Sequence, residues 1–280
     1  MHRTLTLPVK SLIVWCCLLA APAHAADVPR GALGKPDLNG TWQVMNRANF
    51  DLQIHGAKAA MALREGPFGP LPAREVVALG AVGAVPAGLG VVEGNDIPYQ
   101  DWAAQQKLDN QQNWLTQDPE VKCYLPGIPR ANYMPYPFQI FHSARAVFFA
   151  YEYAGAVRNI YLDDPGPAPV DSWMGQSVGH WDNDTFVIEV SGFNDRTWFD
   201  RAGNFHSDAL RVVERFTRLS DHTMTYEATI EDPNVFTAPW KISMTLYRKI
   251  GKDAQLQQFK CVEFVEELLY GHLRKEPLDS

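Results

Sequence analysis

The chain has 280 residues, a formal charge of −7 and four cysteines. This length suits one large domain or two small ones. The acidic balance, with no cluster of lysine and arginine, argues against nucleic acid partners and against anionic membrane surfaces.

The first 25 residues have the pattern of a secretory signal peptide. Arg3 and Lys10 give a basic start, residues 11–21 (SLIVWCCLLAA) form a short apolar run, and residues 23–25 (AHA) match a cleavage site. The run is shorter than the roughly 20 residues of a transmembrane helix, so we expect no membrane insertion. We expect cleavage after Ala25 and export to the periplasm or secretion. The mature chain then has a formal charge of −9, because the removed segment holds two basic residues and no acidic one.

Cleavage leaves two cysteines, Cys123 and Cys261. In an oxidising compartment such a pair favours a disulfide, here closing a loop of well over 100 residues. The alternative is a pair of buried free thiols. Because there is no CxxC motif, the sequence gives no support for a redox or zinc role.

The first half of the mature chain holds few regular elements. Residues 37–44 predict a turn into a first strand. Residues 66–98 are rich in Gly, Pro, Ala and Val and have no sustained period of 2 or 3.6, which is typical of a lid, a binding loop or a disordered segment. Residues 101–117 predict one helix, which Asp101 caps and Pro119 follows.

After residue 137 apolar and polar residues alternate, as in strands that bury one face. The predicted strands are residues 147–153, 157–162, 176–181, 185–191, 210–219, 223–230, 241–249 and 256–263. Strands joined mainly by hairpins must close or fold over to bury a core. We therefore predict a single mainly β domain over residues 26–280, an antiparallel lipocalin-like barrel or strongly curved sheet with one accessory helix.

One predicted strand places a carboxylate among core residues. Within residues 210–219, Glu214 shares a face with apolar residues such as Phe216. A buried carboxylate must be paired or protonated. Glu214 therefore either forms a structural ion pair with Arg158 or Arg248, or lines a cavity as an acid or base.

The loop of residues 192–209 combines carboxylates, a histidine and large aromatic residues between two predicted strands. Aromatic walls with titratable groups are typical of binding or catalytic pockets, and the alternative is a salt-bridged surface loop. His206 is the candidate base, oriented by Asp208 or Asp195, and Glu214 or Tyr151 is the candidate acid. The candidate substrate-binding residues are Trp173, Trp181, Trp198, Tyr161 and Arg158.

Residues 175–179 (GQSVG) match the G-x-S-x-G motif of serine hydrolases. That motif needs a strand, a tight turn and a helix, but the residues after Gly179 predict a turn into another strand. Ser177 is therefore interpreted as a strand residue, with a serine hydrolase as an alternative function. The histidines and acidic turns lack the spacing of known zinc or calcium sites, so we expect neither a metal nor a cofactor.

Residues 40–42 (GTW), at the start of the first strand, resemble the G-x-W motif of lipocalin-like barrels. In this resemblance Arg248 takes the place of the arginine that packs on the tryptophan. Residues 173–181, the loop through Asp208 and residues 214–216 also resemble a family of exported bacterial proteins, a resemblance that implies no activity. The lipocalin resemblance implies a barrel with a cavity for an apolar or amphipathic ligand.

The sequence thus predicts an exported enzyme that performs cofactor-free acid–base chemistry, such as elimination, hydration, isomerisation or cyclisation. A hydrophobic small molecule is the expected substrate, because aromatic residues are dense around the candidate groups. The alternative is a non-catalytic carrier of an apolar ligand in the same cavity. A structural protein of the cell envelope would lack a ligand-sized cavity.

Overall fold

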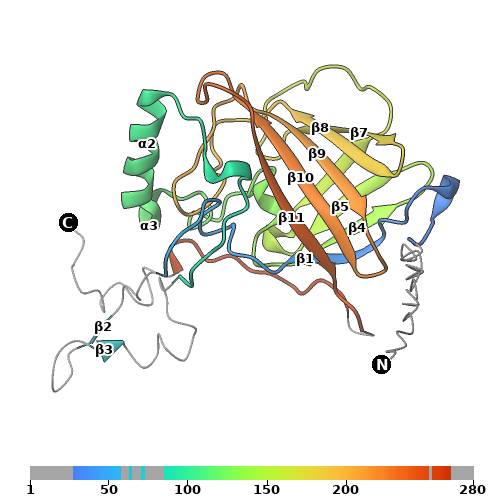
Figure 1. The fold of residues 1–280 in the computed structure, drawn as a ribbon, viewed down its shortest axis with the longest axis horizontal. Coiled ribbons are helices and arrows are strands. Elements are labelled where there is room, and N and C mark those ends of the chain that lie inside the picture. The colour runs from blue at the N-terminus through green and yellow to red at the C-terminus, as the bar shows by residue number, and fades with distance from the viewer. Residues whose placement is uncertain (1–27, 58–62, 65–70, 73–84, 252–253, 266–280) are drawn as a thin grey trace, which may run out of the picture.

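A computed structural model describes residues 28–57, 63–64, 71–72, 85–251 and 254–265. The described chain forms a closed barrel of nine strands (Figure 1), in the order β1-β11-β10-β9-β8-β7-β6-β5-β4. This confirms the predicted mainly β barrel, but residues 256–263, which were predicted as a strand, form none. The strands are β1 (Gly40–Val44), β4 (Phe138–His142), β5 (Val147–Tyr151), β6 (Val157–Tyr161), β7 (Gln176–Asp182), β8 (Thr185–Ser191), β9 (Arg211–Arg218), β10 (Thr223–Glu231) and β11 (Trp240–Arg248). The predicted signal peptide, and most of the insertion predicted over residues 66–98, lie outside the described residues.

The helices contribute no part of the barrel wall. α2 (Asp101–Gln112) and α3 (Trp114–Gln117) stand beside the barrel (Figure 1) and replace the single predicted helix by two pieces with a break at Asn113. The 3-10 turns are η1 (Ala32–Gly34), η2 (Glu93–Asn95), η3 (Arg130–Asn132) and η4 (Tyr153–Gly155), and β2 (Leu63–Arg64) pairs with β3 (Leu71–Pro72) in a separate small sheet. Among the described residues, no helix has the length and apolar character needed to cross a bilayer.

Neighbouring strands of the barrel pair antiparallel, except β6 and β7, which run parallel. The short connections predicted after β7 and after β9 are hairpins, as expected. The parallel pair arises because residues 162–175 carry the chain back along the barrel before β7 begins, instead of turning directly onto β6. β1 closes the barrel by pairing with β11 on one side and with β4 on the other.

Alternation along each strand decides which side chains enter the interior. In β8, Phe186 and Ile188 are buried while Glu189 is exposed, as predicted. In β9, Glu214 is fully buried on the same face as Phe216. Large side chains fill much of this interior, and they are Trp42, Phe138, Phe149, Phe186, Phe216 and Tyr226.

The tryptophan of the G-x-W motif packs against a different arginine from the one predicted. Trp42 is fully buried, and the guanidinium carbon of Arg218 lies 5.6 Å from its ring centroid. Arg248 pairs with Trp42 in the strand register, but its side chain lies beside Gly40, where a Cβ would come within 2.9 Å of Arg248 Nε. The arginine on Trp42 therefore comes from β9, because the side chain of Arg248 occupies the space that Gly40 leaves open.

One end of the barrel is covered by residues 127–134, which we call the plug. Its residues are buried, and its Asn132 bonds to Glu214 in the middle of β9 and to Tyr151 at the end of β5, the end that faces the start of β9. The plug therefore lies over the end at which β9 begins, which we call the plugged end. The loop of residues 192–209 packs on the plug, since the Tyr133 hydroxyl donates to the Phe199 carbonyl at 2.8 Å.

Candidate functional site

A polar cluster lies beneath the plug, inside the otherwise apolar barrel. Glu214 Oε1 accepts hydrogen bonds from Asn132 Nδ2 at 2.6 Å and from the Tyr226 hydroxyl at 2.8 Å. Glu214 Oε2 forms a buried ion pair with Arg158 Nη2. The Tyr151 hydroxyl donates to Asn132 Oδ1 at 2.9 Å. These side chains form the barrel cluster, in which both oxygens of Glu214 are engaged by protein groups.

Burial and the ion pair determine the protonation states of the side chains in the barrel cluster. Burial alone would lower the pKa of Arg158, but the charge and hydrogen bond of Glu214, together with the interactions of Tyr151, outweigh burial and raise it. Burial raises the pKa of Tyr151 and of Tyr226 above the ordinary value of 10.0, so both phenols stay protonated. Arg158 Nη1 has no hydrogen-bond acceptor among the described residues. One N–H of the buried guanidinium is therefore left without an acceptor in the described chain.

Ser177 belongs to this interior and lies in β7, as predicted from its neighbours. It is buried, and its Oγ accepts a hydrogen bond from Arg158 Nε at 2.8 Å. The chain continues from β7 through a hairpin into β8, not into a helix. The strand–turn–helix geometry that activates the serine of hydrolases is therefore absent around Ser177.

His206 is buried at the plugged end, where both of its ring nitrogens are engaged. Nδ1 lies 2.8 Å from the Ser207 carbonyl oxygen, which can only accept, so Nδ1 carries the proton. Nε2 then accepts from the Thr197 hydroxyl at 2.6 Å. The rings of Phe193 and Phe199 pack on the imidazole with centroids 5.9 and 5.3 Å away. Burial lowers the pKa of His206 and favours the neutral ring.

The aspartates of the loop lie in different environments. Asp200 is fully buried and accepts from Asn204 Nδ2 at 2.5 Å, and burial raises its pKa to about 7. Asp195 and Asp208 are exposed. Asp200 therefore organises the loop from within, while Asp195 and Asp208 face solvent.

No carboxylate in the described part of the chain bonds to the His206 ring. Asp195 and Asp232 act on the ring through charge alone, each raising its pKa against the larger effect of burial. The structure thus separates the predicted catalytic residues. Glu214 and Tyr151 meet inside the barrel, His206 lies in the loop, and Asp208 faces a groove on the surface.

A groove of about 820 Å³ opens at the plugged end, outside the barrel wall. Its walls come from the end of β8, the start of β9, the β10–β11 connection and residues 167–171, and we call it the rim groove. Leu210 and Phe236, with several prolines, give it apolar surface. The charged residues that line it are Asp171, Asp208, Arg211, Glu231 and Asp232. Its volume lies in the range of about 300–1,000 Å³ that is typical of small-molecule sites.

Most charged groups of the rim groove have no partner within the described part of the protein. Asp208, Arg211 and Glu231 form no side-chain hydrogen bond or ion pair with the described residues, although Arg211 and Glu231 face each other in the β9–β10 register. Asp232 differs, because it is buried and accepts from the Ser207 backbone N–H at 2.6 Å and from the Ser207 hydroxyl at 2.9 Å. Asp171 also has no partner among the described residues, so the groove offers a ligand three carboxylates and one guanidinium.

The predicted substrate-binding aromatic residues lie in separate places, and none of them lines the rim groove. Trp198 is buried in the loop, and Trp173 packs on Tyr124 with ring centroids 4.5 Å apart. Trp181 is half-buried at the opposite end of the barrel, and Tyr161 is exposed on β6. The remaining predicted binding residue, Arg158, belongs to the barrel cluster.

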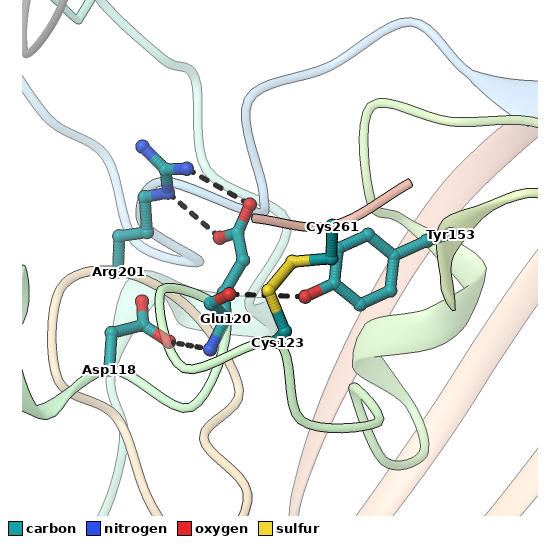
Figure 2. Close-up of a disulfide and its surroundings, with 6 residues drawn as sticks. All are labelled: Asp118, Glu120, Cys123, Tyr153, Arg201 and Cys261. Atoms are coloured by element: carbon teal, nitrogen blue, oxygen red, sulfur yellow. Dashed lines mark hydrogen bonds and ion pairs between the residues drawn. A yellow bond between two sulfur atoms is a disulfide. The ribbon is translucent and has the colours of Figure 1, made fainter. Parts of the chain in front are cut away.

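Cys123 and Cys261 pair as a disulfide, as predicted, and Figure 2 shows the ion pair of Glu120 with Arg201 beside them. Glu120 accepts from Arg201 Nε at 2.8 Å and from Arg201 Nη2 at 2.9 Å, and from Arg130 Nη2 at 2.8 Å. Burial alone would raise the pKa of Glu120, but Arg201 and Arg130 outweigh burial and lower the pKa to about 2. The disulfide therefore lies beside a carboxylate that contacts both the plug and the loop.

Several residues of these sites were not found from the sequence. Asn132 lies in the plug, a segment without periodicity, so no pattern marked it. Tyr226 occupies the buried face of a predicted strand, but only the β9–β10 register places it near Glu214. Arg211 and Glu231 sit at strand ends that alternation assigns to solvent, and their facing positions also follow from the register.

Comparison with known proteins gives no information on what the site does. No family model, no curated protein and no solved structure matches the chain. In the described ranges, no three His, Cys, Asp or Glu side chains gather where they could hold a metal ion. Function is therefore inferred from the chemistry of the site.

Proposed function

We propose that the protein is an exported enzyme that performs cofactor-free acid–base chemistry on an apolar or amphipathic small molecule bound in the rim groove. One observation carries the proposal: Asp208 and Glu231 line a groove of about 820 Å³ and have no partner in the described chain. A group that exchanges a proton with a substrate must be free to contact it. Asp208 and Glu231 meet this condition, whereas Glu214 is engaged by protein groups.

The groove supplies the groups that such a reaction needs. Asp208 is the proposed base that removes a proton from the substrate, and Glu231 is the proposed acid that returns one. Arg211, opposite Glu231, would stabilise negative charge that develops on a substrate oxygen. Leu210 and Phe236 would bind the apolar part of the molecule.

In this proposal His206 positions the base and does not take the proton itself. Its ring holds the carbonyl of Ser207, the residue that precedes Asp208, and is itself held by Thr197. Ser207 also donates to Asp232 in the groove wall. The segment that carries Asp208 is thus fixed from two sides.

A carrier without catalysis is the second candidate, and the openness of the groove favours it. The side chains of Asp208, Arg211 and Glu231 are exposed. Acid–base enzymes commonly exclude water from the reacting groups, whereas a carrier has no such requirement. The two candidates share the groove and differ in whether a bound molecule is converted.

The test uses the compound that co-purifies with the exported protein, incubated with wild type and with two variants. Asp208→Asn should bind the compound as wild type does and lose turnover by about 100-fold or more, since general acid–base groups contribute on that scale. Glu189→Gln, which changes an exposed carboxylate on β8 outside the groove, should keep full turnover. Binding without turnover in wild type would establish the carrier, and full turnover in Asp208→Asn would contradict the enzyme proposal.

A serine hydrolase would use a different residue and is tested separately. We expect a fluorophosphonate probe to leave Ser177 unlabelled, because its hydroxyl is buried in β7 and bound to Arg158. Ser177→Ala should retain most of any activity found for the wild type. Intact-mass spectrometry reads out the labelling, and stoichiometric modification of Ser177 would show that the reaction is nucleophilic.

A further inference from the structure

Buried ion pairs connect the turn that carries Cys123 to the plug. Arg130, in the plug, is 1% exposed and donates to Asp118 at 2.8 and 3.1 Å and to Glu120 at 2.8 Å. Both carboxylates belong to residues 118–124, which we call the anchor turn. Figure 2 shows this turn, with Asp118 accepting from the Glu120 backbone N–H and with Cys123 a few residues further on. The anchor turn therefore holds the plug through a guanidinium with two carboxylate partners.

The other half of the disulfide belongs to the C-terminal residues 254–265, which we call the strap. Phe259 packs on Tyr136 and Tyr153, with ring centroids 4.9 and 5.0 Å away. The Phe264 N–H donates to the Val121 carbonyl of the anchor turn at 2.8 Å. A cavity of about 200 Å³ remains between the strap and the anchor turn, with Glu120 and Cys261 in its wall. The strap thus covers the anchor turn, and the disulfide joins the two covalently.

The plug covers the one buried cationic N–H of the barrel cluster that lacks an acceptor in the described chain. Asn132 holds Glu214 from the plug side, and Arg158 Nη1 is left without a partner among the described residues. Water that reached this cluster would supply the missing acceptor, so exclusion of water depends on a closed plug. An open plug would give small polar groups access to Arg158.

Both cysteines are half-buried, so a reductant has partial access to their sulfur atoms. Neither residue lines the rim groove, and no residue of the plug or strap does. The disulfide therefore joins the strap to the anchor turn away from the rim groove.

We infer that the Cys123–Cys261 disulfide is a redox latch that holds the plug closed over the barrel cluster. A dithiol reductant gives two electrons and two protons to the disulfide, which becomes two cysteine thiols, and the reductant becomes a disulfide. The strap then separates from the anchor turn. Glu120 and Asp118 lose the cover that shields their ion pairs with Arg130 from water. The plug opens because its charged anchor has weakened.

Hydrogen–deuterium exchange of the mature protein, read by mass spectrometry before and after reduction, tests the latch. We expect amides of residues 127–134 to exchange about tenfold faster or more in the reduced protein, while those of β8 and β10 keep their rates. Cys261→Ser should reproduce this pattern without reductant. Arg130→Met should open the plug even with the disulfide intact, whereas Arg215→Met, which removes an exposed ion pair with Asp182, should leave it closed.

Two outcomes would overturn the latch. Unchanged exchange in residues 127–134 after reduction would show that the plug does not depend on the disulfide. Equal acceleration in all strands would show that the disulfide stabilises the whole fold and has no particular effect on the plug. If Cys261→Ser does not fold, reduction of the folded wild-type protein still decides between these outcomes. The groove proposal is unaffected by either result, because it concerns other residues.

Discussion

Arg158 and Glu214 lie together in an interior filled with aromatic side chains, where each charge alone would be costly to bury. Removal of one ion from water costs several kcal/mol, and only close pairing with further hydrogen bonds offsets that cost. Asn132, Tyr226 and Ser177 provide those bonds at 2.6 to 2.8 Å. The pair is therefore tolerated because its neighbours satisfy it, and loss of one partner should be far worse than loss of both.

Arg158→Met should lower the free energy of unfolding by about 3–5 kcal/mol, because it leaves Glu214 buried without its cation. The double variant with Glu214→Leu should recover much of that loss, since no unpaired charge remains. Urea unfolding of wild type, both single variants and the double variant measures the coupling. Additive losses in the double variant would contradict the assigned pairing.

His206 gives a pH dependence whose direction follows from its lowered pKa. The folded protein keeps the ring neutral, whereas the unfolded chain binds a proton below about the ordinary value of 6.5. Below that pH the unfolded state binds more protons than the folded state does. The stability that the neutral ring provides above pH 6.5 is therefore lost as the pH falls from 6.5 toward the pKa of His206 in the folded protein. His206→Gln, which keeps hydrogen-bonding groups but does not titrate, should weaken this loss.

The measurement is thermal unfolding of wild type, His206→Gln and the control His222→Gln from pH 8 to pH 5. His222 is exposed in the hairpin between β9 and β10, so its replacement should leave the pH dependence as in wild type. Identical pH profiles for wild type and His206→Gln would contradict the buried neutral imidazole.

At the scale of elements, the plug and the loop meet at a glycine. Gly127 has φ +72°, and a Cβ there would lie 2.5 Å from Thr197 Oγ1, the hydroxyl that binds His206. The plug thus approaches the loop more closely than any side chain at position 127 would permit. This contact fixes the rim of the plugged end.

Gly127→Ala should destabilise the protein more than Gly155→Ala does. Gly155 has a similar φ of +61° but nothing within 4 Å of its Cβ position, so its substitution reports backbone strain alone, about 1–2 kcal/mol. At Gly127 the clash with Thr197 adds about 1–3 kcal/mol of overpacking. Urea unfolding gives both values, and equal losses would show that the two elements are not in close contact.

At the scale of the whole molecule, the barrel was predictable because period-2 alternation and hairpin turns act locally along the chain. The parallel pairing of β6 with β7 was not predictable. The sequence of residues 162–175 does not indicate whether the chain returns to the other end of the barrel before β7 begins. The prediction that Arg248 packs on Trp42 was also wrong. Arg218 and Arg248 both end strands near it, and only packing around Gly40 decides between them.

Local sequence patterns also revealed only part of the candidate site. Glu214 stood out because a carboxylate on an apolar face breaks a local pattern, and the structure pairs it with Arg158, one of the two predicted partners. The rim groove had no such local signal. It gathers residues 167–171, 191–192, 208–211 and 231–239 from separate parts of the chain, and exposed acids at strand ends look ordinary in sequence.

Binding of a small molecule in the rim groove is the central claim, and the compounds that co-purify with the protein test it most directly. Ala238→Trp would fill the groove with an indole, while Ala144→Trp places the same side chain in the exposed turn between β4 and β5, at the opposite end. Organic extracts of wild type and both variants are compared by mass spectrometry at equal protein amounts. We predict a compound that is abundant in wild type and Ala144→Trp and about tenfold or more depleted in Ala238→Trp. Equal amounts in all three proteins would contradict the claim.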